Sequence, residues 1–169
     1  MSALDPVLRR WPILAFAASA AMLIVAHGFQ SLGHLEPCHL CLEQRQVYWA
    51  ALPVSGVAAI LLASPRETAA RRIGGAVLVL VFAYGAYLAA FQAGAEWKWW
   101  PAPATCSSTG PVSLHDLGAL LGGAAARPPA CDVAAWVFLG LSMAGWNFLI
   151  QLALIALSAL SALTPARRP

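Results

Sequence analysis

The chain contains four cysteines, and two of them lie close enough in sequence to form a redox pair. Cys38 and Cys41 enclose His39 and Leu40 in a C-x-x-C motif, a spacing that lets two thiols close a small, reactive disulfide. Arg45 follows Cys41 by four residues, so the two side chains share one face of a helix. If that helix begins at the motif, its dipole, its unpaired N–H groups and the Arg45 charge should all lower a thiol pKa below about 8.5. The motif therefore predicts a nucleophilic cysteine.

The other two cysteines, Cys106 and Cys131, leave the type of site open. A c-type haem site would need a histidine directly after Cys41, where this chain has Leu42. A structural zinc site would prefer a second closely spaced pair, so no metal site is predicted. Two inert structural disulfides fit the spacing as well as redox chemistry does, because four cysteines permit three pairings. Arg45 beside the first pair favours redox chemistry.

The composition indicates that these cysteines are positioned by membrane helices. Of 169 residues, 60% are hydrophobic and 10% are charged, whereas a soluble domain has about 25% charged residues. Apolar runs predict four spans, at about 12–32, 46–63, 72–92 and 136–163, each near or above the ~17 residues that a spanning helix needs. A cleaved signal peptide is the alternative for the first run, but a retained helix is simpler. We therefore predict a single all-α domain, residues 1–169, forming an integral membrane antiparallel four-helix bundle.

The positive charges predict the orientation of this bundle. Short cytoplasmic loops retain Lys and Arg during insertion, and seven of the ten basic residues fall on one side. These seven are Arg9, Arg10, Arg66, Arg71, Arg72, Arg167 and Arg168. Both termini should then lie in the cytoplasm of a bacterium, with periplasmic loops at 33–45 and 93–135. All four cysteines fall in those loops, in a compartment where disulfides persist. No nucleic-acid partner is predicted.

The two predicted outer loops differ in what they can hold. The first is tight, and Pro37 suits the first turn of the second helix, which would place the C-x-x-C motif in that helix's opening turns. The second has about forty residues, enough for an element of its own. Within it, Trp97-Lys98-Trp99-Trp100 is typical of an aromatic belt at the membrane surface. Leucines at positions 114, 117 and 121 recur at helical spacing and predict a short interfacial helix.

Three segments resemble one known family. The run Pro37-Cys38-His39-Leu40-Cys41-Leu42-Glu43-Gln44-Arg45 is similar to the P-C-x-L-C-x-x-x-R signature of the DsbB family of disulfide bond formation proteins. Pro103-Ala104-Thr105-Cys106 resembles the approach to that family's first cysteine of the second outer loop. Cys131-Asp132, Trp136, the run 139–144 and Trp146-Asn147 resemble its entry into the fourth helix. The order, spacing and topology agree from about residue 11 to 163.

The resemblance implies an inner-membrane enzyme that relays electrons through two disulfides, Cys106–Cys131 and Cys38–Cys41. A periplasmic thioredoxin-fold oxidase of the DsbA kind would attack through Cys106, and Cys131 would then attack Cys38. Cys41, beside Arg45, would pass the electrons to a membrane quinone, either ubiquinone or menaquinone. Such partners have reduction potentials of about −120 mV, so only a strongly oxidising acceptor can regenerate them.

Some assignments stay open at the level of sequence. Family members often carry a histidine near the outer end of the third helix, where this chain has Gln92, so the sequence assigns no quinone contact to Gln92 or to Trp97–Trp100. His39 is a candidate for tuning the potential of the pair that encloses it. A quinone reductase of the vitamin K epoxide reductase type would usually place its C-x-x-C later in the helix order. The alternative from another class is a small transporter or assembly factor whose cysteines form structural disulfides only.

Overall fold

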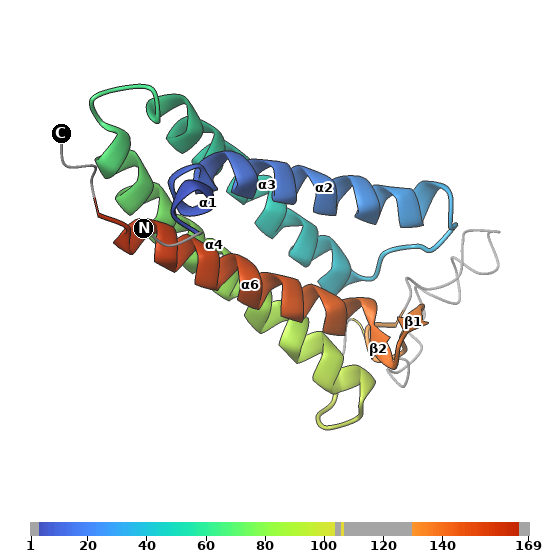
Figure 1. Ribbon diagram of the computed structural model, residues 1–169. Helices are drawn as coiled ribbons and strands as arrows, with labels where there is room; N and C mark the ends of the chain where they lie inside the picture. The colour runs from blue at the N-terminus through green and yellow to red at the C-terminus, as the bar shows by residue number, and fades with distance from the viewer. Residues whose placement is uncertain (1–3, 104–105, 107–129, 166–169) are drawn as a thin grey trace.

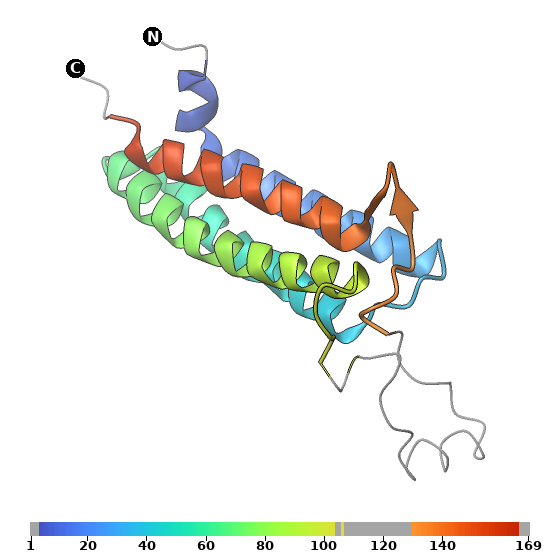
Figure 2. The same cartoon turned by 90° about the horizontal axis from the view of Figure 1, so that it is seen from below.

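A computed structural model describes residues 4–103, 106 and 130–165, and four long helices account for most of them (Figure 1). The elements in chain order are α1 (Asp5–Arg9), α2 (Trp11–Ser31), α3 (His39–Leu61), α4 (Glu67–Glu96), β1 (Val137–Phe138), β2 (Leu141–Ser142) and α6 (Met143–Leu163). The long helices α2, α3, α4 and α6 lie side by side and alternate in direction (Figures 1 and 2). The predicted interfacial helix falls in 107–129, outside the described residues.

The core lies where α4 packs along α3 and α6, while α2 packs mainly on α3. Leu78 and Phe82 of α4 are fully buried there, together with Tyr48 of α3. The helices α4 and α6 approach closely at Gly85, where an added Cβ would lie 2.6 Å from Nε2 of Gln151. Small residues allow such close contact between apolar helices. The predicted helical fold is confirmed in these elements.

Three helices, α2, α4 and α6, are long and apolar enough to cross a membrane, by length and composition, within the described part of the chain. The fourth long helix, α3, falls short of this standard because its first two turns carry Glu43, Gln44 and Arg45. The apolar part of α3 begins only at Val47. The chain is therefore a multi-pass membrane protein, and the crossing by α3 remains a prediction.

The fourth predicted span does not coincide with one helix. The apolar run from residue 136 is divided, since β1 and β2 pair as an antiparallel hairpin and α6 begins only at Met143. Leu139 and Gly140 adopt φ values of 51° and 80°, and two successive positive φ values are typical of a tight hairpin turn. Ser142 then caps α6, because its side chain accepts a hydrogen bond of 3.1 Å from the Gly145 N–H. Apolar composition alone did not separate the hairpin from the helix.

The start of α3 also differs from the prediction. Pro37 precedes the helix, and Cys38 occupies the N-cap position in an extended conformation. Cys41 lies in the first turn, as expected for the second cysteine of the motif. Because the N-cap side chain faces the first free N–H groups of a helix, this placement directs the Cys38 sulfur toward the helix start.

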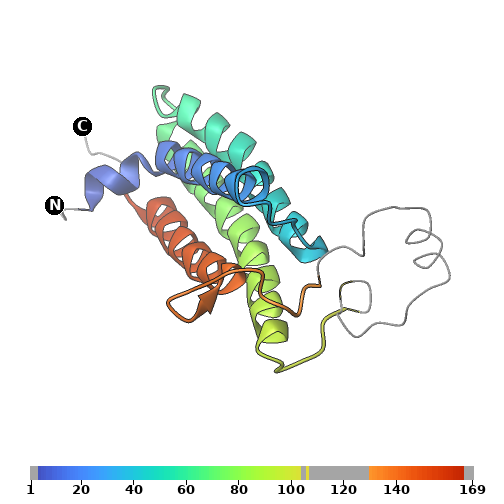
Figure 3. The same ribbon diagram turned by 90° about the vertical axis from the view of Figure 1, so that its right-hand side faces the viewer.

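The described elements place the hairpin and the start of α3 at one end of the helices, and α1 and the α3–α4 connection at the other (Figures 1 and 3). The segment from residue 130 to the hairpin lies at the same end as the start of α3. Residues of both cysteine pairs therefore meet although they are far apart in the sequence.

Candidate active site

All four cysteines meet at the end of the helices where α3 begins. Cys106 and Cys131 are joined by a disulfide with a Cα–Cα distance of 5.2 Å, and the Cys131 N–H donates to the Cys106 carbonyl at 2.6 Å. The sulfur atoms of Cys38, Cys106 and Cys131 lie within 4.8 Å of one another. The exposed fractions of these three residues are only 3%, 6% and 0%, respectively. The fold thus places a free thiol against a disulfide in a site shielded from water.

The C-x-x-C pair is held as two thiols in contact. The Cys38 and Cys41 sulfur atoms are 2.6 Å apart and neither is bonded to another cysteine. Cys38 Sγ also accepts a hydrogen bond of 3.3 Å from the Cys41 N–H, which is the N-cap interaction of α3. A disulfide between these two residues remains a prediction.

Two neighbouring donors make Cys41 the more acidic thiol. The Cys38 thiol and then the Gln92 side-chain amide, with Nε2 at 3.5 Å, donate hydrogen bonds to Cys41 Sγ and lower its pKa to about 6, although burial opposes this. The pKa of Cys38 is raised instead, because its proton is held in the hydrogen bond to Cys41 and because the side chain is buried. Cys41 is therefore the sulfur that carries negative charge most readily.

Arg45 does not act on Cys41 in the way that the spacing predicts. Its guanidinium donates from Nη1 to Gln30 Oε1 at 2.5 Å and from Nη2 to the Ala26 carbonyl at 3.0 Å. Both acceptors belong to the last turns of α2. Arg45 is not among the principal groups that shift the Cys41 pKa, so the expectation that its charge lowers this pKa is replaced by the contribution of neutral donors. The physical reason is the length of the arginine side chain, which reaches the neighbouring helix.

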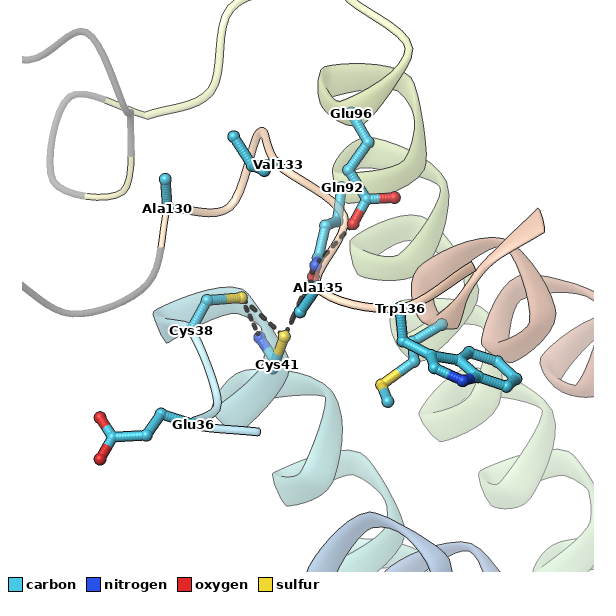
Figure 4. Close-up of a pocket in the computed structure, with 10 residues that line it drawn as sticks. Glu36, Cys38, Cys41, Gln92, Glu96, Ala130, Val133, Ala135 and Trp136 are labelled. Atoms are coloured by element: carbon cyan, nitrogen blue, oxygen red, sulfur yellow. Dashed lines mark hydrogen bonds between the residues drawn. The ribbon is translucent and has the colours of Figure 1, made fainter. Parts of the chain in front are cut away.

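A small cavity of about 40 Å³ adjoins the two thiols (Figure 4). In the close-up, Gln92 and Glu96 extend from α4 toward Cys41, whereas the Glu36 carboxylate points away from the sulfur atoms. The complete lining is Glu36, Cys38, Cys41, Gln92, Glu96, Ala130, Val133, Ala135, Trp136 and Met143. This volume is enough for one or a few waters, since one needs roughly 10–15 Å³ measured in this way.

A shallow apolar groove of about 400 Å³ lies on the outside of α2, lined by Val25, Gly28, Phe29, Leu32 and Gly33. Phe29 packs against Trp136 with ring centroids 5.3 Å apart. Because Trp136 also lines the cavity beside Cys41, the contact between these two rings connects the lining of the groove with the lining of the cavity.

The loop residues around Cys131 are anchored to the end of α4. Lys98 Nζ donates to the Asp132 carbonyl at 2.7 Å and pairs with its carboxylate at 3.1 Å.

Trp100 Nε1 donates to the Phe91 carbonyl at 2.8 Å, and its ring covers Gly94, where an added Cβ would lie 2.0 Å away. At least Trp100 of the predicted aromatic belt therefore folds back on α4.

A disulfide in contact with a free thiol pair, mounted at one end of apolar membrane helices, defines a membrane thiol–disulfide oxidoreductase. The family model described as "Disulfide bond formation protein DsbB" matches residues 8–161. The "Disulfide bond formation protein B" of a Polaromonas species is 29% identical over 161 residues, covering 92% of this chain and 93% of that protein. The protein of the same name from Albidiferax ferrireducens is 33% identical over 152 residues, covering 86% of this chain and 83% of that protein. The chain belongs to the DsbB family of disulfide bond formation proteins.

Proposed function

We propose that this protein reoxidises a periplasmic DsbA-like thiol oxidase and passes the electrons through its two cysteine pairs to a membrane quinone. The observation that carries this proposal is that the other three cysteine sulfur atoms all lie close to that of Cys38. Cys38 Sγ lies within 4.8 Å of the sulfurs of Cys106 and Cys131 and 2.6 Å from that of Cys41. Thiol–disulfide exchange needs such adjacency because each step is the attack of one sulfur on another.

The burial of the outer disulfide supports an order of attack. Cys131 is fully buried and Cys106 is 6% exposed, so the partner's thiolate would attack Cys106, break the Cys106–Cys131 bond and release Cys131 as a thiolate. Cys131 would then attack Cys38 in the oxidised C-x-x-C pair, and Cys41 would leave. A leaving thiol departs faster when its pKa is low, and the hydrogen bond from the Gln92 amide, which lowers the pKa of Cys41, does not require a proton on Cys38. These steps leave Cys41 carrying the electron pair.

The groove on α2 fits an apolar acceptor of the quinone class better than the cavity beside the thiols does. A quinone takes up two electrons and two protons and leaves as a quinol. The groove on α2 is apolar, and Arg45 donates to Ala26 and Gln30 in the same turns of that helix. The cavity beside the thiols, at about 40 Å³, is far below the roughly 300 Å³ of a usual ligand pocket. We therefore infer that the acceptor binds from the groove side, toward Phe29 and Trp136.

The same proposal includes four crossings of the bacterial inner membrane with both termini in the cytoplasm. The outward face of α3 supports its crossing, since Trp49, Val57 and Ile60 are 51%, 59% and 77% exposed. Side chains of this kind are stable on the outside of a helix when lipid covers it. The periplasmic end would then be the one that holds the cysteines, as the basic residues predict.

Replacing Arg45 tests its part in acceptor binding. We expect Arg45→Ala to lower the rate of quinol production about 100-fold, the usual cost of losing one charged or polar donor at a reacting oxygen. The pH at which Cys41 becomes half-maximally reactive toward an alkylating reagent should not change, because Arg45 is not among the principal groups that shift the Cys41 pKa. Arg45→Lys serves as the matched control and should retain part of the rate. A variant with a shifted Cys41 midpoint and a normal quinol rate would contradict this role.

The proposed function predicts a specific pH dependence. Reduced protein mixed with excess quinone should produce quinol at a rate that is constant above neutral pH and falls about tenfold per pH unit well below pH 6. The rate falls as the pH falls because only the thiolate is the nucleophile, and the pKa of Cys41 is lowered to about 6. Stopped-flow absorbance of the quinone measures this rate. No quinol at any pH would favour structural disulfides instead, and a midpoint near the free-thiol value would contradict the site.

A further inference from the structure

A line of buried polar side chains leads from the interior of the helices to Cys41. Gln44 and Tyr48 come from α3, Gln92 from α4 and Asn147 from α6. Their exposed fractions are 6%, 4%, 4% and 9%, respectively. Polar side chains inside apolar helices are costly and usually serve a function.

These side chains form one continuous set of hydrogen bonds. The Tyr48 hydroxyl donates to Asn147 Oδ1 at 2.5 Å, and Asn147 Nδ2 donates to Gln44 Oε1 at 2.5 Å. Gln44 Nε2 then donates to Gln92 Oε1 at 2.8 Å, and Gln92 Nε2 donates to Cys41 Sγ at 3.5 Å. Every donor in this donor chain, Tyr48–Asn147–Gln44–Gln92, therefore points along it toward the Cys41 sulfur.

The direction of the donor chain depends on the state of the sulfur. Each amide accepts with its oxygen and donates with its nitrogen, so turning one amide alone would bring two like groups together. The only other consistent order reverses all of them, so that Gln92 would present its side-chain oxygen to Cys41 and accept a hydrogen bond from the Cys41 S–H. An anionic sulfur has no proton to donate, so it selects the order in which all donors point toward it. Such chains also strengthen each bond by polarisation.

Apart from the Cys38 thiol and the Gln92 amide, the side chains that line the cavity do not favour a negative charge on Cys41. Its titratable neighbours in the cavity are Cys38, Glu36 and Glu96, and Glu96 Oε1 also accepts from Gln92 Nε2 at 3.2 Å. None of the cavity-lining residues within the described part of the chain is a cation. The segment before β1 and helix α6 contribute only non-titratable side chains, which are Ala130, Val133, Ala135, Trp136 and Met143. An anionic Cys41 is therefore stabilised by neutral donors.

We propose that Tyr48, Asn147 and Gln44 are positioning residues, which hold the Gln92 amide with Nε2 toward Cys41 and so stabilise its anionic sulfur. The use of this anion in electron transfer rests on the proposed function. Its stabilisation does not, because it is a property of the thiol pair and its neighbours.

Alkylation of Cys41 as a function of pH tests this inference without a quinone or a partner. The reduced, full-length protein in lipid nanodiscs receives a short pulse of iodoacetamide at each pH, and mass spectrometry of the Cys41 peptide gives the rate at that sulfur. We expect the midpoint of wild-type protein near pH 6. Gln92→Met should raise it by about one pH unit, and Tyr48→Phe and Asn147→Leu by about half a unit or more. Tyr84→Phe is the matched control and should leave it unchanged, because Tyr84 is 54% exposed on α4.

The inference is overturned if Gln92→Met raises the midpoint while Tyr48→Phe and Asn147→Leu match wild type, since Gln92 would then need no positioning. If Asn147→Leu does not fold, Tyr48→Phe decides alone, as it removes a single oxygen atom. Raised midpoints in a protein that reduces no quinone would overturn the proposed function and support the donor chain. Quinone reduction in variants whose midpoints do not change would support the proposed function and overturn the role of the donor chain.

Discussion

Replacing Cys41 with serine should lower quinol production by at least about 10⁴-fold, as loss of a nucleophile does in other enzymes. A serine hydroxyl neither ionises near neutral pH nor forms a disulfide, so no electron pair can leave the C-x-x-C motif. The substitution is small, and the backbone N–H of residue 41 keeps its bond to the Cys38 sulfur at the N-cap. We therefore expect α3 and the Cys106–Cys131 disulfide to be retained. Absorbance of the quinone after addition of reduced donor protein measures the loss.

The control for this prediction is a serine at the adjacent position. Leu42→Ser places the same side chain next to Cys41 at a site that is 45% exposed, and it should keep nearly the full rate. Thermal unfolding of both variants shows whether stability accounts for any difference. Retention of more than a small fraction of the rate in Cys41→Ser, with the fold intact, would assign electron transfer to another group. A change in stability alone would support the structural-disulfide alternative.

Replacing Cys131 with alanine should convert a transient complex into a stable adduct. Without Cys131, a mixed disulfide between Cys106 and the donor cannot be resolved from within this chain. The adduct should rise from undetectable to the major form of the protein in cells that express the native donor. Non-reducing electrophoresis reveals the adduct, a reductant releases it, and mass spectrometry of the released protein identifies the donor.

The matched variant for the trapping experiment is Cys106→Ala, which leaves Cys131 as the remaining thiol of that pair. Cys131 is fully buried next to Cys38, so we expect little adduct with the donor in this case. Equal adducts from both variants would show that the partner does not distinguish the two sulfurs. Adducts from Cys106→Ala alone would reverse the order of attack that we propose.

Much of the fold follows from local features of the chain. Apolar runs of sufficient length predicted α2, α4 and most of α6. The ability of a helix to span a membrane depends on its own length and apolar composition rather than on contact with a distant part of the chain. The division of residues 136–142 into a hairpin was not predicted, since it depends on the positive φ values of Leu139 and Gly140. The start of α3 at the C-x-x-C motif was predicted from Pro37, but the helix begins at His39, two residues after that proline.

The sequence by itself determined which sulfur groups are available for chemistry, because the C-x-x-C spacing and the remaining two cysteines are the same in any fold that the chain adopts. Only the tertiary structure decided what surrounds each sulfur. It brings Gln92, 51 residues away along the chain, to Cys41, and it turns Arg45 toward α2. Hydrogen bonds act over about 3 Å and depend on direction, so their partners are selected by how helices pack. The sequence therefore shows which hydrogen-bonding side chains are present, and the packing of the helices decides which of them pair.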